Sequence, residues 1–273
     1  MKCIQITSKN VDMLINPAMK KTRFLPNSEI YRDQILPSLQ KHLRGNIQGI
    51  GAVSDERCVG YMLFGPLREV ALPISCVLQD IPVIFCYYTE KKYRSKELDR
   101  LLMDEVLKHL KNAPGILTLS SDSKEYMPAK SFIKMGFRSV VQNNNLQILF
   151  LPLKQESIEA ELFNPELEWD YIRPFTFINH PVCLYLLHLQ NMQKKVCERY
   201  KNLLPVEELS WQDAHQKDPH IIPGFYCFGR FVPLYSMNER KLKRHIKQCI
   251  RAETYKTFGA ASSTAYTKRK GKS

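Results

Sequence analysis

A basic turn between a predicted strand and a predicted helix is the stretch of this chain best suited to chemistry. The apolar run Val83–Tyr88 predicts the strand, and residues 91–96 form the turn. The backbone N–H groups that open a helix have no partner within it and carry partial positive charge, which suits a pyrophosphate. Arg94 and Lys96 would add positive charge. The turn therefore predicts an anion site, and the backbone of the preceding strand is placed to hydrogen-bond an extended ligand.

The segment 93–102, Tyr-Arg-Ser-Lys-Glu-Leu-Asp-Arg-Leu-Leu, resembles the acetyl-CoA loop of the GNAT acyltransferase superfamily, which usually reads Arg/Gln-x-x-Gly-x-Gly/Ala. Arg94 matches the first position, whereas Glu97 and Asp99 stand at the two glycine positions. The resemblance implies that acetyl-CoA is the co-substrate. It assigns acetyl-CoA binding to Cys86, Tyr87, Tyr88, Arg94, Ser95, Lys96, Glu97, Leu98, Asp99 and Arg100.

The two carboxylates are a departure from that loop. Glycine lets a backbone approach phosphates without a Cβ atom. Glu97 and Asp99 instead bring negative charge, which is unfavourable if both side chains point inward. If they point outward from the first helical turn, the helix dipole favours them. The sequence leaves both arrangements open.

A second motif lies at residues 129–137. Its sequence, Ala-Lys-Ser-Phe-Ile-Lys-Met-Gly-Phe, resembles the later helix of GNAT enzymes and its Gly-Phe ending. In many of these enzymes a tyrosine of this helix is the general acid toward the leaving thiolate, but Ile133 stands at that place here. Tyr126 and Tyr88 are the alternatives. The two motifs extend the resemblance over residues 1–153.

The resemblance implies transfer of an acetyl group from acetyl-CoA to the amine of a small molecule or a peptide. A neutral amine would attack the thioester carbon, while the fold positions both groups and removes the amine proton. Glu69 or Asp80 is a candidate base, and the N–H of Cys86 or Tyr87 is a candidate donor to the thioester oxygen. The rival hypothesis is a non-catalytic module that binds acyl-CoA or recruits a partner through its basic surface, because the loop glycines and the redox cysteine expected in the second half are missing.

Hydrophobic periodicity supplies the elements that would position these residues. An apolar stripe over Leu98–Leu110 predicts the helix after the basic turn, and Pro114-Gly115 ends it. Ser54–Arg57 predicts a hairpin turn, and the acidic, polar residues 154–168 predict a linker. The expected order is β-α-β-β-β-β-α-β-α-β, a mixed α/β fold. Strands are expected at 3–6, 47–53, 58–64, 74–78, 83–88, 116–119 and 146–153, and helices at 30–43, 98–110 and 129–135.

The second half, residues 169–257, predicts a smaller α/β unit. Its expected order resembles that of a thioredoxin-like domain, and the whole chain resembles the YoaP-type acetyltransferases, which join a GNAT domain to such a domain. The order consists of a strand at 175–178, a helix at 182–200, a strand at 206–209, a hairpin over 225–232 and a basic helix at 238–250.

The residues around the start of the second-half helix predict that no dithiol cycle operates there. Redox-active relatives begin this helix with a cysteine, because a helix N-terminus stabilises a thiolate. His180 occupies that position, and Cys183 stands at the place of the resolving thiol. Pro223, or alternatively Pro219, would be the cis-proline of this fold.

Composition limits the remaining classes. The eight cysteines lack paired ligand spacing, which predicts free thiols rather than a zinc site or a disulfide scaffold. No apolar run is long enough to cross a bilayer and the N-terminus lacks a signal-peptide core, so a cytoplasmic protein is expected. The formal net charge of +13 gathers late in the chain, and residues 258–273 predict a basic disordered tail. Nucleic acid stays open as a partner, but no binding motif accompanies the charge, which favours a solvated helix face.

Overall fold

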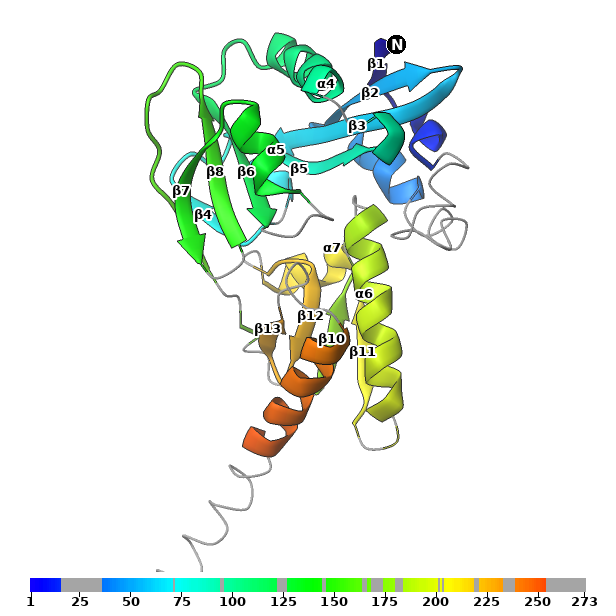
Figure 1. Ribbon diagram of the computed structural model, residues 1–273. Helices are drawn as coiled ribbons and strands as arrows, with labels where there is room; N and C mark the ends of the chain where they lie inside the picture. The colour runs from blue at the N-terminus through cyan, green and yellow to red at the C-terminus, as the bar shows by residue number, and fades with distance from the viewer. Residues whose placement is uncertain are drawn as a thin grey trace, which may run out of the picture.

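The computed structural model contains two main sheets, each with its own core (Figure 1). A seven-stranded sheet lies in the first half of the chain and a four-stranded sheet in the second, and a two-stranded sheet accompanies the first. The structure describes residues 1–15, 36–70, 72–93, 96–121, 127–143, 146–163, 166–167, 174–179, 184–200, 202, 204–218, 221–232 and 239–253.

The seven-stranded sheet confirms the predicted mixed α/β fold. In spatial order its strands are β1 (Lys2–Ile6), β2 (Gln48–Ser54), β3 (Arg57–Pro66), β5 (Pro82–Thr89), β6 (Gly115–Ser121), β8 (Leu146–Pro152) and β7 (Arg138–Asn143). Neighbours run antiparallel except β5 and β6, which are parallel. Asp55 and Glu56, at φ 50° and 61°, form the predicted hairpin turn between β2 and β3.

Two helices pack on the strands of this sheet. The helix α4 (Lys96–His109) packs on β1, β2 and β3, and the predicted apolar stripe buries Leu98, Leu102 and Val106. The helix α5 (Ala129–Lys134) packs against β8 and is followed by Gly136 at φ +97°, a conformation that glycine adopts without strain. The shorter helical segments are η1 (Val11–Ile15), residues 36–42, α3 (Leu67–Val70) and η2 (Lys91–Tyr93).

Two features of the first half differ from the sequence prediction. Periodicity does not predict β7, because no residue of that strand is fully buried and no apolar face alternates along it. The strand β4 (Ile74–Cys76) does not join the main sheet but pairs with β9 (Ala160–Leu162). Part of the linker expected at 154–168 is therefore folded onto the first half, where Ile158 and Ala160 lie in the core, whereas Leu167 packs in a core cluster of the second half.

The four-stranded sheet of the second half contains one parallel pair. In spatial order its strands are β11 (Val206–Leu209), β10 (Phe175–Ile178), β12 (Gly224–Cys227) and β13 (Arg230–Val232), and only β10 and β11 are parallel. The helical segments are α6 (Leu184–Cys197), η3 (Glu198–Tyr200), α7 (Trp211–Lys217) and residues 239–253. Phe177 and Phe225 stack in the core with ring centroids 4.6 Å apart.

Two local features of the second half refine the prediction. The unpredicted helix α7 begins after Ser210, whose Oγ accepts a hydrogen bond from the Asp213 N–H at 3.1 Å. No peptide bond among the described residues is cis, so the cis-proline expected at Pro223 is wrong and that bond has the ordinary trans form. Pro219, the alternative, lies outside the described residues, as do His180 and Cys183.

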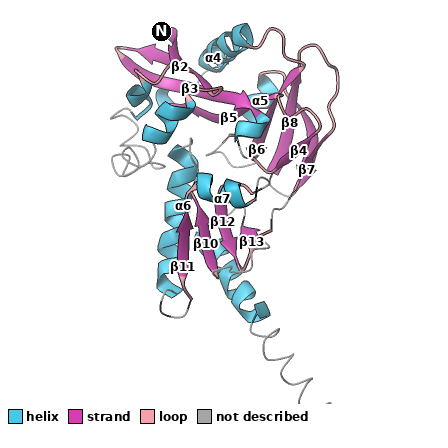
Figure 2. Ribbon diagram, turned by 180° about the vertical axis from the view of Figure 1, so that it is seen from behind, coloured by secondary structure: helices cyan, strands magenta, loops and turns pink. Residues whose placement is uncertain are grey.

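The helix α6 touches both halves. Leu186 is buried in the core of the first half, whereas Val196 and Cys197 lie in the core of the second. Figure 2 shows the helix running alongside the second sheet toward the first. None of the helices in the described part of the chain is both long enough and apolar enough to span a membrane.

Candidate functional site

The two parallel strands at the centre of the first sheet separate along their length. β5 and β6 are paired at Val83–Leu117 and Ile84–Thr118, and the Thr118 hydroxyl donates to the Ile84 carbonyl at 2.8 Å. Both strands continue beyond these pairs, but no further register pair joins their described residues. In Figure 1, β3 and β5 lie across the direction of β6, β8 and β7. Where a strand edge is open, an extended ligand can bind it by main-chain hydrogen bonds.

A β-bulge marks where the separation begins. The register between β3 and β5 passes from Leu63–Cys86 to Phe64–Ile84, so Phe85 is the extra residue of β5. A bulge bends its strand and increases the local twist. Because this bulge directly follows the last parallel pair, it accounts for the turn of β5 away from β6.

The backbone of Tyr87 faces the opening. Backbone groups of successive strand residues point alternately toward the two neighbouring strands. The Glu90 N–H donates to the Val59 carbonyl of β3 at 2.8 Å, so the backbone groups of Tyr88 and Cys86 face β3 as well. Of the two donors that the sequence proposes, the alternation places Tyr87 on the open side.

The Tyr87 side chain joins three elements around the opening. Its hydroxyl donates a hydrogen bond to the Asp99 carboxylate, in the first turns of α4. Its ring meets Phe132 of α5 edge-on, with centroids 5.5 Å apart. Phe132 in turn packs on Phe137 at 5.3 Å. Tyr87 therefore contacts both α4 and α5.

A cleft of about 480 Å³ lies between α4 and the end of α5. Its charged lining is balanced, because two carboxylates and two cations face it. Arg100 and Asp104 form one ion pair at 3.7 Å. The lining residues are Asp99, Arg100, Met103, Asp104, Leu107, Lys134 and Met135.

The two loop carboxylates lie in different places. Glu97 is exposed and is not among the residues of the cleft. Asp99 is half-buried, lines the cleft and accepts the Tyr87 hydrogen bond. The sequence leaves open whether the two carboxylates point inward or outward. In the structure Glu97 points outward and Asp99 faces the cleft.

The remaining predicted residues have unequal access to a ligand. Cys86 and Leu98 are buried, so only their backbone is left to contact one, and Tyr88 packs against Tyr61 at 5.7 Å. Lys96 begins α4, so its backbone is at the helix start. Arg94 and Ser95 lie outside the described residues.

Arg57, which lies against Tyr93 of the basic turn, is missing from the sequence prediction. Arg57 at the start of β3 pairs with Glu90 at 2.9 Å and lies over the Tyr93 ring, 5.8 Å from its centroid. Lys92 lies 4.5 Å from the same centroid. Hydrogen bonds from Lys92 and then Arg57 lower the pKa of Tyr93. The basic composition of 91–96 indicates Lys92, whereas Arg57 is too distant in sequence to be associated with the loop.

The candidate acids and bases do not gather at the opening. Ile133 is 51% exposed, so the position of the usual tyrosine faces solvent. Glu69 accepts a hydrogen bond from Asn46, and Asp80 pairs with Arg68 at 2.6 Å; both lie near the start of β5, away from its open end. Tyr126 lies outside the described residues. Across the described residues, no group of three or more His, Cys, Asp or Glu could hold a metal ion.

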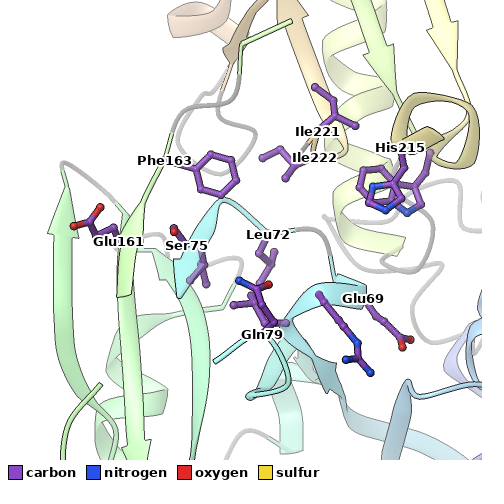
Figure 3. A pocket seen from close by; sticks show the side chains of 13 residues that line it. Glu69, Leu72, Ser75, Gln79, Glu161, Phe163, His215, Ile221 and Ile222 are labelled. Atoms are coloured by element: carbon purple, nitrogen blue, oxygen red, sulfur yellow. The ribbon is translucent and has the colours of Figure 1, made fainter. Parts of the chain in front are cut away.

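A second cleft, of about 750 Å³, lies between the two halves (Figure 3). Side chains of α3 and β4 form one wall, and α7 with Ile221 and Ile222 forms the other. Trp211 and His215 of α7 pack with ring centroids 4.7 Å apart. Glu69 lines this cleft and not the opening between β5 and β6.

Comparison with known proteins finds similarity in solved structures alone. No family model matches the chain, and no curated protein matches it. A PaiA N-acetyltransferase from Thermoplasma acidophilum in complex with coenzyme A is 13% identical, with a TM-score of 0.41, and the match covers 56% of this chain and 99% of that one. The ribosomal-protein-S18-alanine N-acetyltransferase of Escherichia coli is 9% identical, with a TM-score of 0.39, over 57% of this chain and 96% of that one. An acetyltransferase from Thermus thermophilus is 17% identical, with a TM-score of 0.40, over 56% and 98%.

Proposed function

We propose that the first half of the chain is a GNAT-type domain that binds acetyl-CoA and transfers its acetyl group to an amine. The observation that carries this proposal is the separation of β5 from β6 after Ile84, with a helix that starts soon after the end of β5. An open parallel pair supplies strand backbone to an extended ligand, and the adjoining helix start supplies N–H groups to its phosphates. Only residues 90–95 connect the edge of β5 to the start of α4.

The residues present fit acetyl-CoA at most, but not all, positions. The pyrophosphate would lie at the start of α4, near Lys96 and the cations Arg57 and Lys92, with Arg94 and Ser95 from the loop. The pantetheine arm would follow the open edge of β5. Asp99 opposes this placement, because its carboxylate faces the cleft and would repel a phosphate.

The proposed reaction takes place at the opening between β5 and β6. A neutral amine attacks the thioester carbon, and the carbonyl oxygen gains negative charge. The Tyr87 N–H, which the alternation directs into the opening, would donate to that oxygen. The thiolate of CoA leaves, and the amine proton passes to water, since Glu90 at the end of β5 is paired with Arg57 and Asp99 accepts the Tyr87 hydroxyl. The acceptor is an amine of a small molecule or a peptide.

The alternative is a binding module without catalysis. Two observations favour it: Ile133 at the position of the general acid, and Asp99 facing the cleft where a glycine is usual. A domain of this kind would bind acetyl-CoA weakly and release no CoA. Binding and turnover therefore have to be measured separately.

The proposal extends to the second half as a thioredoxin-like domain, which would make the chain similar to the YoaP-type acetyltransferases. The element order supports it: β10, α6, β11, α7, β12, β13 and a final helix. The parallel pairing of β10 with β11, and the antiparallel placement of β12 and β13 on the other side, support it as well.

Isothermal titration calorimetry with acetyl-CoA tests the binding step, with ATP as a matched control that has phosphates but no pantetheine arm. We expect heat with acetyl-CoA and much less with ATP. Absence of heat, together with absence of a thermal shift, at millimolar acetyl-CoA would sink the proposal. Release of CoA thiol in the presence of a panel of amines then separates the transferase from the binding module, which would give no release.

A further inference from the structure

A group of reactive side chains lies in the second half, away from the proposed acetyl-CoA cleft. Cys227 of β12 lies in the buried core of the second half, and Cys249 of the helix at 239–253 packs against the same core. His245, one turn before Cys249, holds its Nε2 atom 3.5 Å from the Cys249 Sγ. Cys227 is fully buried, whereas Cys249 is partly exposed, so a small solute reaches only the second thiol directly.

The charges around this pair favour a thiolate at Cys249. The hydrogen bond from Cys227 and that from His245 lower the pKa of Cys249, and Arg230 acts in the same direction. The hydrogen bond with Cys249 raises the pKa of Cys227, as do burial and the nearby Cys197 and Glu253. Of the two thiols, Cys249 is therefore the one that ionises more readily. Thiolates, not thiols, are the nucleophiles in cysteine chemistry.

We propose that Cys249 is a peroxide-sensitive thiol and that its oxidation closes a disulfide with Cys227. The Cys249 thiolate attacks the terminal oxygen of a hydroperoxide, and the O–O bond breaks. The alcohol, or water from hydrogen peroxide, leaves with a proton from the His245 imidazolium, and Cys249 becomes a sulfenic acid. The Cys227 sulfur then attacks the Cys249 sulfur. The S–O bond breaks, the hydroxide leaves with the Cys227 proton as water, and two thiols have been oxidised by one peroxide.

This chemistry sets Cys249 apart from the other partly exposed cysteine of the described residues. Cys3 is also half-buried, but burial and Glu105 raise its pKa to about 11. The two cysteines thus have similar access to solvent and opposite tendencies to ionise. Cys3 is therefore the internal control for any reagent that reacts with thiolates.

Alkylation of the full-length protein with iodoacetamide at neutral pH tests the first step. Peptide mass spectrometry should show Cys249 alkylated roughly 10-fold faster than Cys3, or more, because thiolate content controls the rate. His245→Gln should slow Cys249 severalfold and leave Cys3 unchanged. Equal rates at the two cysteines in the native protein would overturn the proposal, whatever the variant does.

Treatment with hydrogen peroxide tests the second step. We expect a cross-linked peptide pair that contains Cys227 and Cys249 and that reductant separates. Cys227→Ser should abolish the cross-link and let Cys249 proceed to sulfinic acid, whereas Cys183→Ser should change neither result. A cross-link to Cys197 or Cys183 instead, or stable sulfenic acid on native Cys249 without a cross-link, would refute the pairing. Since these outcomes are read in the native chain, they do not depend on how well a variant at the buried Cys227 folds, nor on acetyl-CoA binding.

Discussion

In each half, a strand paired in parallel with one neighbour precedes a long helix: β5 precedes α4, and β10 precedes α6. β10 stays paired with β11 at all four of its positions, from Phe175 to Ile178. β5 is paired with β6 at two positions, and the bulge at Phe85 then turns it away. The first half thereby gains an opening inside its sheet, while the second keeps a continuous sheet and carries the proposed reactive thiol on the helix at 239–253. The two halves thus share the strand-to-helix connection and differ in the register of the strand, which is the feature on which the proposed acetyl-CoA site depends.

The largest effect is expected from removing one buried ring in either half. Phe132→Ala should cost about 3–5 kcal/mol of unfolding free energy, because the ring is fully buried against Tyr87 and Phe137. Phe225→Ala should cost a similar amount in the second core. Hydrogen exchange should show lost protection in β6 and β8 for the first variant and in β10 and β12 for the second. If each variant deprotects both sheets equally, the two cores form one cooperative unit and the comparison between them fails.

The proposed acetyl-CoA site of the first half predicts that Arg94 binds the phosphates of the ligand. Arg94→Ala should weaken acetyl-CoA binding by about 1–3 kcal/mol, the usual loss of a charge-assisted hydrogen bond. Arg44→Ala removes the same charge from an exposed position that is not in the cleft, and should leave the affinity unchanged. Calorimetry measures both. Equal losses in the two variants would mean that overall charge, not the loop, attracts the ligand.

A smaller effect separates the two loop carboxylates. Asp99→Asn should tighten acetyl-CoA binding by about 1 kcal/mol, because it removes the negative charge that faces the cleft and keeps an acceptor for the Tyr87 hydroxyl. Glu97→Gln, on the exposed side of the same turn, should change it much less. Comparable gains from both variants would contradict the division between inward and outward carboxylates.

The smallest effect concerns two histidines with opposite pKa shifts. Burial lowers the pKa of His42 in the first half, so the unfolded chain takes up this proton first, and stability declines as the pH falls from about 6.5 toward the lowered value. The hydrogen bond with Cys249 raises the pKa of His245, whose contribution is present below about pH 6.5 and is lost as the pH rises through the raised value. In urea unfolding, His42→Gln should flatten the acid-side decline and His245→Gln the alkaline-side decline. The reverse pattern would show that the shifts have been assigned the wrong sign.

Local patterns predict most elements of both sheets. The apolar run of β5, the basic turn and the stripe of α4 are contiguous, so 3.6-residue and alternating periodicities are enough to find them. β7 and α7 are not found, because β7 has no fully buried residue and α7 is short and polar. Contacts distant in sequence are harder to predict: Tyr87 meets Asp99 and Phe132, and Cys249 packs against the core that holds Cys227, only in the folded chain. The bulge at Phe85 is one residue of extra length relative to β3, and no feature of composition marks it.

The pairing of β4 with β9 bears on how the protein can be divided into fragments. A truncation after residue 153 would look natural from the sequence, yet it would remove β9 from its partner and strip Ile158 and Ala160 from the first core. It would also expose the pocket that Leu186 of α6 fills. A first-half fragment therefore needs residues through at least Phe163, and an apolar surface left by the lost helix would make even that fragment prone to self-association.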